Sequence, residues 1–164
     1  MKVHISAEEG AAANQRVLIS VESLADIHLV SLNCEARRPV SGGNLTLLTE
    51  VGVNGVVDGR RLVTTSKYRA WATDDDTDDG PDGNGVKWLI TASISVNWVL
   101  RDGAEVTYAD AQCFAAAQGA MTCHPYAREL IQNMTSRMSY PAATLDLAHS
   151  PWAGDGIELN LPDR

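Results

Sequence analysis

Apolar and polar residues alternate along four segments of the chain, the pattern that predicts β-strands with one covered and one hydrated face. The clearest segment is 88–100, where every second residue from Trp88 onward is apolar and the odd positions from Thr91 to Asn97 are polar. Similar alternation, interrupted by glycine-containing turns, marks 26–36, 44–54 and 62–72, with the even positions of 26–36 expected on the covered face. This order predicts a four-stranded antiparallel sheet.

Three further segments have the pattern of helices. Residues 6–23 begin with Ser6 and Glu9, the signature of a capping box, although the β-branched run that follows leaves a strand from about Leu18 as the competing interpretation. A short alanine-rich helix is expected over 107–118. Pro125 suits the first position of a third helix, because its missing N–H costs nothing there. We therefore predict an α+β fold with helices packed on one face of the sheet.

Charge and length narrow the possible functions. The net charge of −8 and the lack of a basic cluster argue against nucleic acid as a partner. We interpret the aspartate-rich segment 74–85 as a solvated hairpin loop, because Val86 falls where an EF-hand needs its bidentate glutamate, and Thr77 falls where the pattern has Asp or Asn. At 164 residues the chain is expected to form a single domain, 1–164.

Sequence features that report on location favour the cytoplasm. The first residues lack the apolar run of a signal peptide, and no segment has the roughly 20 apolar residues of a membrane-spanning helix. The three cysteines (Cys34, Cys113 and Cys123) are odd in number and lack CxxC spacing. Free thiols fit a reducing compartment, so we expect a cytoplasmic protein without membrane insertion.

No arrangement of residues in the sequence predicts catalysis. The four histidines are scattered without the HxxxH or HExxH spacing of a zinc site, and His124 before Pro125 suits a structural or N-cap role. Neither a GxSxG nucleophile motif nor a phosphate-binding loop is present. We therefore expect no enzyme activity, no catalytic residue, no metal and no cofactor.

The segment from Pro125 to Ala148, PYARELIQNMTSRMSYPAATLDLA, carries the most specific motif. It resembles the C-terminal hallmark of the SecB family of export chaperones, which consists of P-Y-A-R-E, then S-R, then a proline and L-x-L-A. The close match covers 24 of the 164 residues, and the order of four strands followed by helices agrees with the family. The resemblance implies a SecB-like holdase that binds unfolded or aggregation-prone polypeptide in hydrophobic grooves.

The resemblance also implies a homotetramer built as a dimer of dimers, with the long helix at the interface. One apolar stripe of that helix is expected there: Tyr126, Leu130, Met134 and Met138. For the peptide groove we take the aromatic and aliphatic residues of the fourth strand and of the segment after the helix: Trp88, Ile90, Trp98, Leu145, Leu147 and Trp152. Residues 150–164 are too rich in glycine and proline for the family's last helix. We expect an irregular tail there, in which Trp152 contributes little to stability.

Two features bear on the choice of client. Glu35 keeps one of the acidic positions with which export SecB proteins dock the SecA translocase, whereas Ser31 and Thr91 replace two others. One branch of the family serves toxin–antitoxin systems. Members that lack the full set of SecA-docking residues and the last helix resemble this chain more closely than the export type does. We therefore favour an antitoxin or other specialised client over an exported preprotein.

Two alternatives from other classes stay open at this point. The first is a small-molecule-binding α+β domain, in which Trp88 and Trp98 line a closed pocket. The second is a purely structural oligomerisation subunit. A tetrameric mass in solution favours the chaperone, and a monomer favours the pocket protein.

Overall fold

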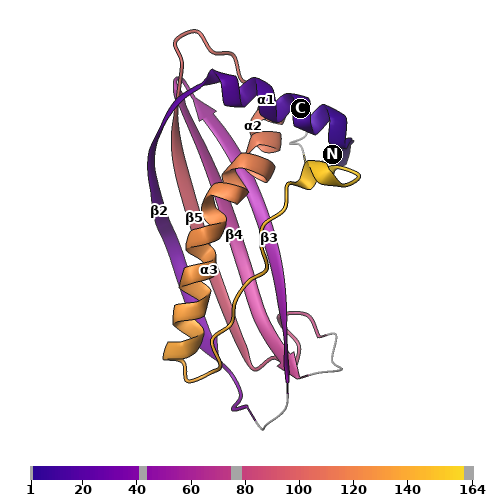
Figure 1. Ribbon diagram of the computed structural model, residues 1–164, viewed down its shortest axis with the longest axis vertical. Helices are drawn as coiled ribbons and strands as arrows, with labels where there is room; N and C mark the ends of the chain where they lie inside the picture. Colours follow the sequence, from indigo (N-terminus) through magenta and orange to yellow (C-terminus); the bar gives the residue numbers. More distant parts are fainter. Residues whose placement is uncertain (1, 41–43, 75–78, 161–164) are drawn as a thin grey trace.

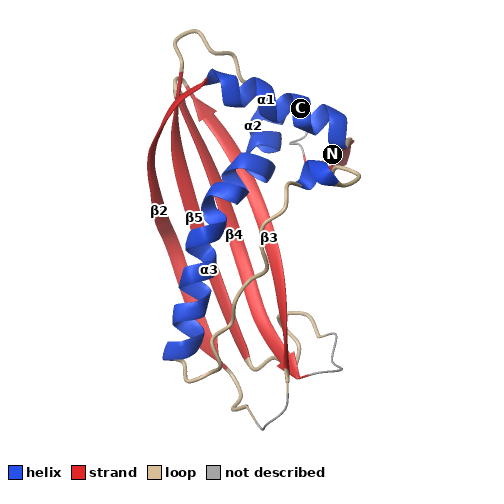
Figure 2. Cartoon of the chain, in the orientation of Figure 1, coloured by secondary structure: helices blue, strands red, loops and turns tan. Residues whose placement is uncertain are grey.

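The computed structural model of the chain describes residues 2–40, 44–74 and 79–160. Its main layer is a four-stranded antiparallel sheet with the strand order β2-β5-β4-β3. The helices lie on one face of this sheet, and α1 crosses its end (Figures 1 and 2). The strands are β2 (Val21–Ala36), β3 (Leu45–Asp58), β4 (Arg61–Asp74) and β5 (Trp88–Leu100). The predicted α+β fold is confirmed.

The alternation in β5 was predicted correctly, since Ile90, Ala92 and Val96 are buried beneath the helices. The prediction for β2 was wrong in part. Three register irregularities interrupt its pairing with β5, and each changes the face on which the following residues lie. His28 consequently pairs with Ser95 on the face away from the helices, whereas Leu32 pairs with Ala92 on the helix side.

Helix α1 (Ala7–Ser20) begins with the predicted capping box. The Glu9 backbone N–H donates to Ser6 Oγ at 3.3 Å, and the Ser6 backbone N–H donates to the Glu9 carboxylate at 3.2 Å. The helix ends where β2 begins, so the competing strand from Leu18 does not form. The cap satisfies two of the backbone donors that a helix start leaves unpaired.

The two later helices are one continuous helical segment, in contrast to the prediction. It consists of α2 (Tyr108–Phe114), the π-helical turn η1 (Ala115–Gly119) and α3 (Ala120–Arg137). Pro125 lies inside α3 and does not open it. Pro125 has no N–H to donate to the Met121 carbonyl. Both residues are exposed, so water can donate to that carbonyl instead. Helix α3 ends where Ser139 adopts a positive φ of 66°.

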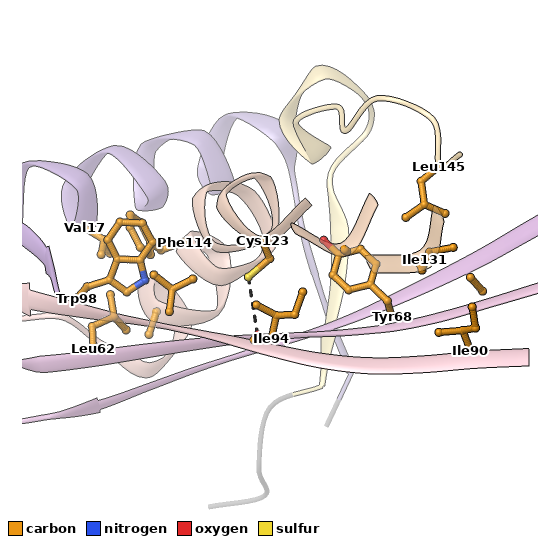
Figure 3. Close-up of a cluster of buried hydrophobic side chains, with 14 of the residues drawn as sticks. Val17, Leu62, Tyr68, Ile90, Ile94, Trp98, Phe114, Cys123, Ile131 and Leu145 are labelled. Carbon is orange, nitrogen blue, oxygen red and sulfur yellow. Dashed lines mark hydrogen bonds between the residues drawn. The ribbon is translucent and has the colours of Figure 1, made fainter. Parts of the chain in front are cut away.

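The core fills the space between this helical segment and the sheet (Figure 3). At one end, Trp98 meets Phe114 edge to face with ring centroids 5.1 Å apart, and its indole N–H donates to Thr64 Oγ1 at 2.9 Å. At the other end, Ile131 of α3 and Leu145 of the following segment cover Ile90 (Figure 3). Large side chains at both ends fix the helical segment along the sheet.

The two ends of the chain form a second, smaller sheet that the sequence did not predict. Strand β1 (Lys2–Ile5) pairs antiparallel with β6 (Ile157–Asn160), which follows the 3₁₀ turn η2 (Pro151–Ala153). These elements pack against α1 and α2, where Ala13, Cys113 and Leu159 form their own apolar cluster with Trp152 at its margin. The expected irregular tail therefore contains a strand over its described residues.

The opposite face of the large sheet carries a third cluster. Trp71, Val86 and Leu89 are buried there against Leu48. The Trp71 indole N–H donates to the carbonyl of Asp79, which ties the described part of the aspartate-rich loop to the sheet. Residues 75–78 of that loop lie outside the described residues. None of the helices in the described part is long and apolar enough to cross a membrane.

Candidate functional site

One pocket lies on the helix side of the sheet, beside the edge strand β3. It has a volume of about 630 Å³ and opens between β3, the helical segment and the C-terminal part of the chain. Val51, Val53 and Tyr68 contribute from the sheet, and Tyr108 and Met121 from the helices. His149 and Leu159 close it from the C-terminal side. Its lining is mainly apolar, as expected of a site that holds hydrophobic side chains.

A second pocket, of about 390 Å³, lies further along the same strand. Leu45 and Leu47 of β3 form one side, and the segment 141–144 forms the other. Trp88, which is only 1% exposed, lies at its floor. The two pockets therefore follow β3 on the same face of the sheet.

Three side chains hold the segment that separates α3 from the tail. The Tyr140 hydroxyl donates to two backbone carbonyls, that of Arg38 at 2.8 Å and that of Lys87 at 2.9 Å. Thr135 Oγ1 accepts from the Ala143 N–H at 3.0 Å, and His124 Nε2 donates to the Asp146 carbonyl at 2.6 Å. The segment has no regular secondary structure, and these bonds fix its course across the helix side of the sheet (Figure 1).

The six residues predicted to bind peptide do not form one surface. Ile90, Trp98 and Leu145 are core residues, with at most 5% of each exposed. Trp88 reaches only the floor of the smaller pocket, whereas Leu147 is 68% exposed. Trp152 packs over Gly10 of α1, where an added Cβ would overlap its ring. Only Leu147 is freely available to a partner as the structure stands.

Comparison with known proteins identifies the architecture. No protein-family model and no curated protein sequence matches the chain. Among solved structures, the SecB-like chaperone Rv1957 of Mycobacterium tuberculosis, in complex with a ChAD peptide from the HigA1 antitoxin Rv1956, matches with a TM-score of 0.74. The match covers 85% of this chain and 99% of that protein at 18% sequence identity. The chain has the SecB-like fold.

Within this SecB-like fold, the predicted interface stripe of α3 is partly exposed to solvent. Tyr126 is 51% exposed and Leu130 is half-buried, whereas Met134 and Met138 pack against the core. Tyr126 and Leu130 line a small apolar hollow together with Ile27 and Leu29 of β2. The exposed part of the stripe therefore continues onto the neighbouring edge strand.

Glu35, the predicted SecA-docking residue, is already paired within the chain. The Arg37 guanidinium donates to Glu35 Oε2 at 3.0 and 2.9 Å, and Asn33 Nδ2 donates to Oε1 at 2.9 Å. These bonds, those from Arg37 first, hold the pKa of Glu35 below its usual value. The carboxylate is therefore ionised but locally neutralised, and docking to SecA through it stays a prediction.

Two buried thiols and one buried tyrosine on this side of the sheet do not suit nucleophilic chemistry. Burial raises the pKa of Cys113 to about 11 and also raises the pKa of Cys123, so both thiols are protonated at neutral pH. The Cys123 thiol lies 3.7 Å from the Ile94 carbonyl (Figure 3). Burial likewise raises the pKa of Tyr68. The described residues contain no cluster of three potential metal ligands.

The alternative of a pocket lined by two tryptophans gains no support. Trp88 and Trp98 lie near opposite ends of β5, and they contribute to different pockets. The indole of Trp98 is packed against Phe114 and bonded to Thr64. Both tryptophans contribute mainly to the core.

The sequence did not reveal the residues that build the pockets. Neither Tyr140 nor Gln112 has a role in the sequence prediction. In the structure, Tyr140 anchors the segment over Trp88, and Gln112 lies at the margin of the larger pocket. Their roles depend on long-range backbone contacts, which leave no periodic pattern in the sequence. The Tyr-Pro pair after a helix was the only available signal.

Proposed function

We propose that this protein is a non-enzymatic holdase that binds extended segments of unfolded or aggregation-prone polypeptide along the helix side of β3. The main support is the SecB-like fold, which it has in common with a chaperone that was solved with a bound peptide. The two apolar pockets beside β3 give this idea a physical basis, because they can accept side chains without selecting a particular sequence. No nucleotide or metal is needed for such binding.

The client class that we favour is an antitoxin, with an exported preprotein as the alternative. The structural neighbour is in complex with a peptide from an antitoxin, and the acidic side chain expected to dock SecA is paired with Arg37 in this chain. A specialised client predicts selective binding of one segment. A general export role predicts binding of most unfolded chains.

The proposed working form is a homotetramer, a dimer of dimers. Tyr126 and Leu130 would lie in its interface with the exposed apolar residues of β2, which include Leu29 and Leu32. Exposed apolar area of this kind on neighbouring elements is typical of surfaces that a partner covers.

Binding of a reduced and carboxymethylated protein, which stays unfolded without denaturant, tests the proposal by calorimetry. We expect binding by the wild type. Leu147→Ser should weaken it about tenfold or more, because an exposed apolar anchor is lost. Leu18→Ser, the same change at an exposed leucine of α1, is the control and should bind as the wild type does.

Two results would contradict parts of the proposal. Failure of the folded wild type to bind any unfolded chain would exclude a holdase. Equal binding by the Leu147 and Leu18 variants would remove the 145–149 segment from the binding surface. A peptide from the HigA1 ChAD region, compared with a scrambled version of the same composition, separates a selective from a general client preference.

A further inference from the structure

The side chain of Gln112 completes the hydrogen bonding of one residue of the edge strand β3. Gln112 Nε2 donates to the Gly55 carbonyl at 2.8 Å, and the Gly55 N–H donates to Gln112 Oε1 at 3.3 Å. The same amide nitrogen also donates to Asn54 Oδ1 at 3.1 Å. A single side-chain amide thus takes the place that the backbone of an adjacent strand would occupy.

The position of Gln112 shows which backbone groups of β3 point away from the sheet. In an antiparallel ladder, alternate residues direct both N–H and C=O to the same side. The residues in phase with Gly55 therefore point their backbone groups outward: Leu45, Leu47, Thr49, Val51 and Val53. Within the described residues, none of these five makes a backbone hydrogen bond outside the sheet.

This edge lacks the features that protect exposed strands. Folded proteins usually block an edge with lysine, proline, a bulge or a covering element. The sequence LTLLTEVGV from Leu45 to Val53 contains neither lysine nor proline, and β3 pairs with β4 through 14 successive residues without an irregularity. By contrast, the opposite edge strand, β2, has three irregularities in its register.

Four of the five residues whose backbone groups point outward from β3 also line the two pockets. Leu45 and Leu47 belong to the smaller pocket, and Val51 and Val53 to the larger one. A strand added to this edge would direct every second side chain toward the helix side, where the pockets lie. The linings contain no lysine or arginine, and the chain as a whole carries a net charge of −8.

We propose that the client adds a fifth strand to the sheet by pairing its backbone with β3 between Leu45 and Val53. The segment that fits is extended, has apolar residues at alternate positions and carries basic residues at its flanks. Gln112 ends the run, because it already occupies the outward groups of Gly55. This inference rests on the proposed holdase function and specifies how the same site holds its client.

Backbone methylation of a peptide tests the inference on the unaltered protein. The probe is a short peptide in which leucine and threonine alternate between lysines at both ends. Two versions carry N-methyl groups, one on the leucines and one on the threonines. Because only alternate N–H groups can face β3, one version should bind about tenfold or more weakly and the other nearly as well as the parent. Antiparallel pairing predicts loss with methylated leucines, and parallel pairing predicts loss with methylated threonines.

A pair of variants tests the protein side. Thr49→Pro removes one outward N–H at an exposed position, a place where an edge strand tolerates proline. Thr49→Ala removes the same side-chain groups but keeps the N–H. We expect the proline variant to bind the parent peptide about tenfold more weakly than the alanine variant, with similar circular dichroism.

The outcomes separate this inference from the proposed function. If both methylated peptides bind like the parent, or both lose binding equally, edge pairing is wrong while the holdase proposal stands. If the wild type binds neither the parent peptide nor the carboxymethylated protein, the holdase proposal itself fails. Should Thr49→Pro not fold, the comparison of the two methylated peptides on the wild type still decides.

Discussion

At the scale of single residues, buried polar side chains fix the margins of the proposed site. Gln112 is 5% exposed and satisfies three groups on β3 with one amide. Thr135 is fully buried, and its hydroxyl holds the segment after α3 through the Ala143 N–H. Such bonds matter mainly because a buried donor or acceptor that loses its partner is costly.

Gln112→Met should therefore destabilise the protein although it keeps the size of the side chain. The Gly55 N–H and carbonyl would lose their partner in a buried place. We expect the free energy of unfolding to fall by about 2 kcal/mol in urea titrations. The control is Gln118→Met in the adjacent π-helical turn. It should change the free energy of unfolding by less than about 0.5 kcal/mol, since Gln118 is only half-buried and accepts from Thr122 through its backbone carbonyl, which the substitution keeps. Equal losses in both variants would contradict the role assigned to Gln112.

At the scale of elements, the junction of α1 with the tail decides how the two ends of the chain are held. Gly10 lies inside α1, where glycine is unfavourable by roughly 1 kcal/mol relative to alanine. The indole of Trp152 occupies the space that a Cβ would need. The glycine is thus explained by the ring that covers it and not by the helix.

This arrangement predicts that Gly10→Ala changes the free energy of unfolding in opposite directions with and without the Trp152 ring, which a double-mutant cycle can measure. In the wild type, Gly10→Ala should lower the free energy of unfolding, because the new methyl group displaces the Trp152 ring. In a Trp152→Ala background, the same substitution should raise the free energy of unfolding by up to about 1 kcal/mol, through helix propensity alone. Trp152→Ala by itself should be destabilising, contrary to the expectation from the sequence. An equal effect of Gly10→Ala in both backgrounds, measured by thermal and urea unfolding, would show that the two residues are not coupled.

The elements also show what the sequence can and cannot reveal. The bounds of β5 and the cap of α1 were predictable because alternation and capping are local patterns. The helix start at Pro125 was wrong because packing against the sheet extends α3 to Ala120. The pairing of β1 with β6 joins the two ends of the chain, and no local pattern reports such a contact. The placement of Trp98 and Leu145 in the core has the same cause, since burial depends on what covers a residue.

At the scale of the whole molecule, two surfaces of the sheet are left for partners. The β3 edge with its pockets is the proposed client site, and the β2 edge continues into the exposed part of α3. The two edges lie on opposite sides of the four-stranded sheet (Figure 1). The proposed assembly through the β2 side would therefore leave the β3 side free, so that one subunit could contact copies of itself and a client at the same time.

Leu130→Asp tests the assembly side of this arrangement. Leu130 is half-buried beside Tyr126 and Leu29, and a partner surface would bury an aspartate there without a counter-charge. We expect the wild type to scatter light as a tetramer of 17.6 kDa subunits and the variant as smaller species, since an unpaired buried charge costs several kcal/mol. Asn133→Asp introduces the same charge at an exposed position of α3 and should leave the tetramer intact.

A wild type that scatters as a monomer would contradict the tetramer, and an unchanged mass for Leu130→Asp would place the interface elsewhere. If the dissociated variant keeps its affinity for an unfolded client, then the β3 side of a single subunit contains the whole client site.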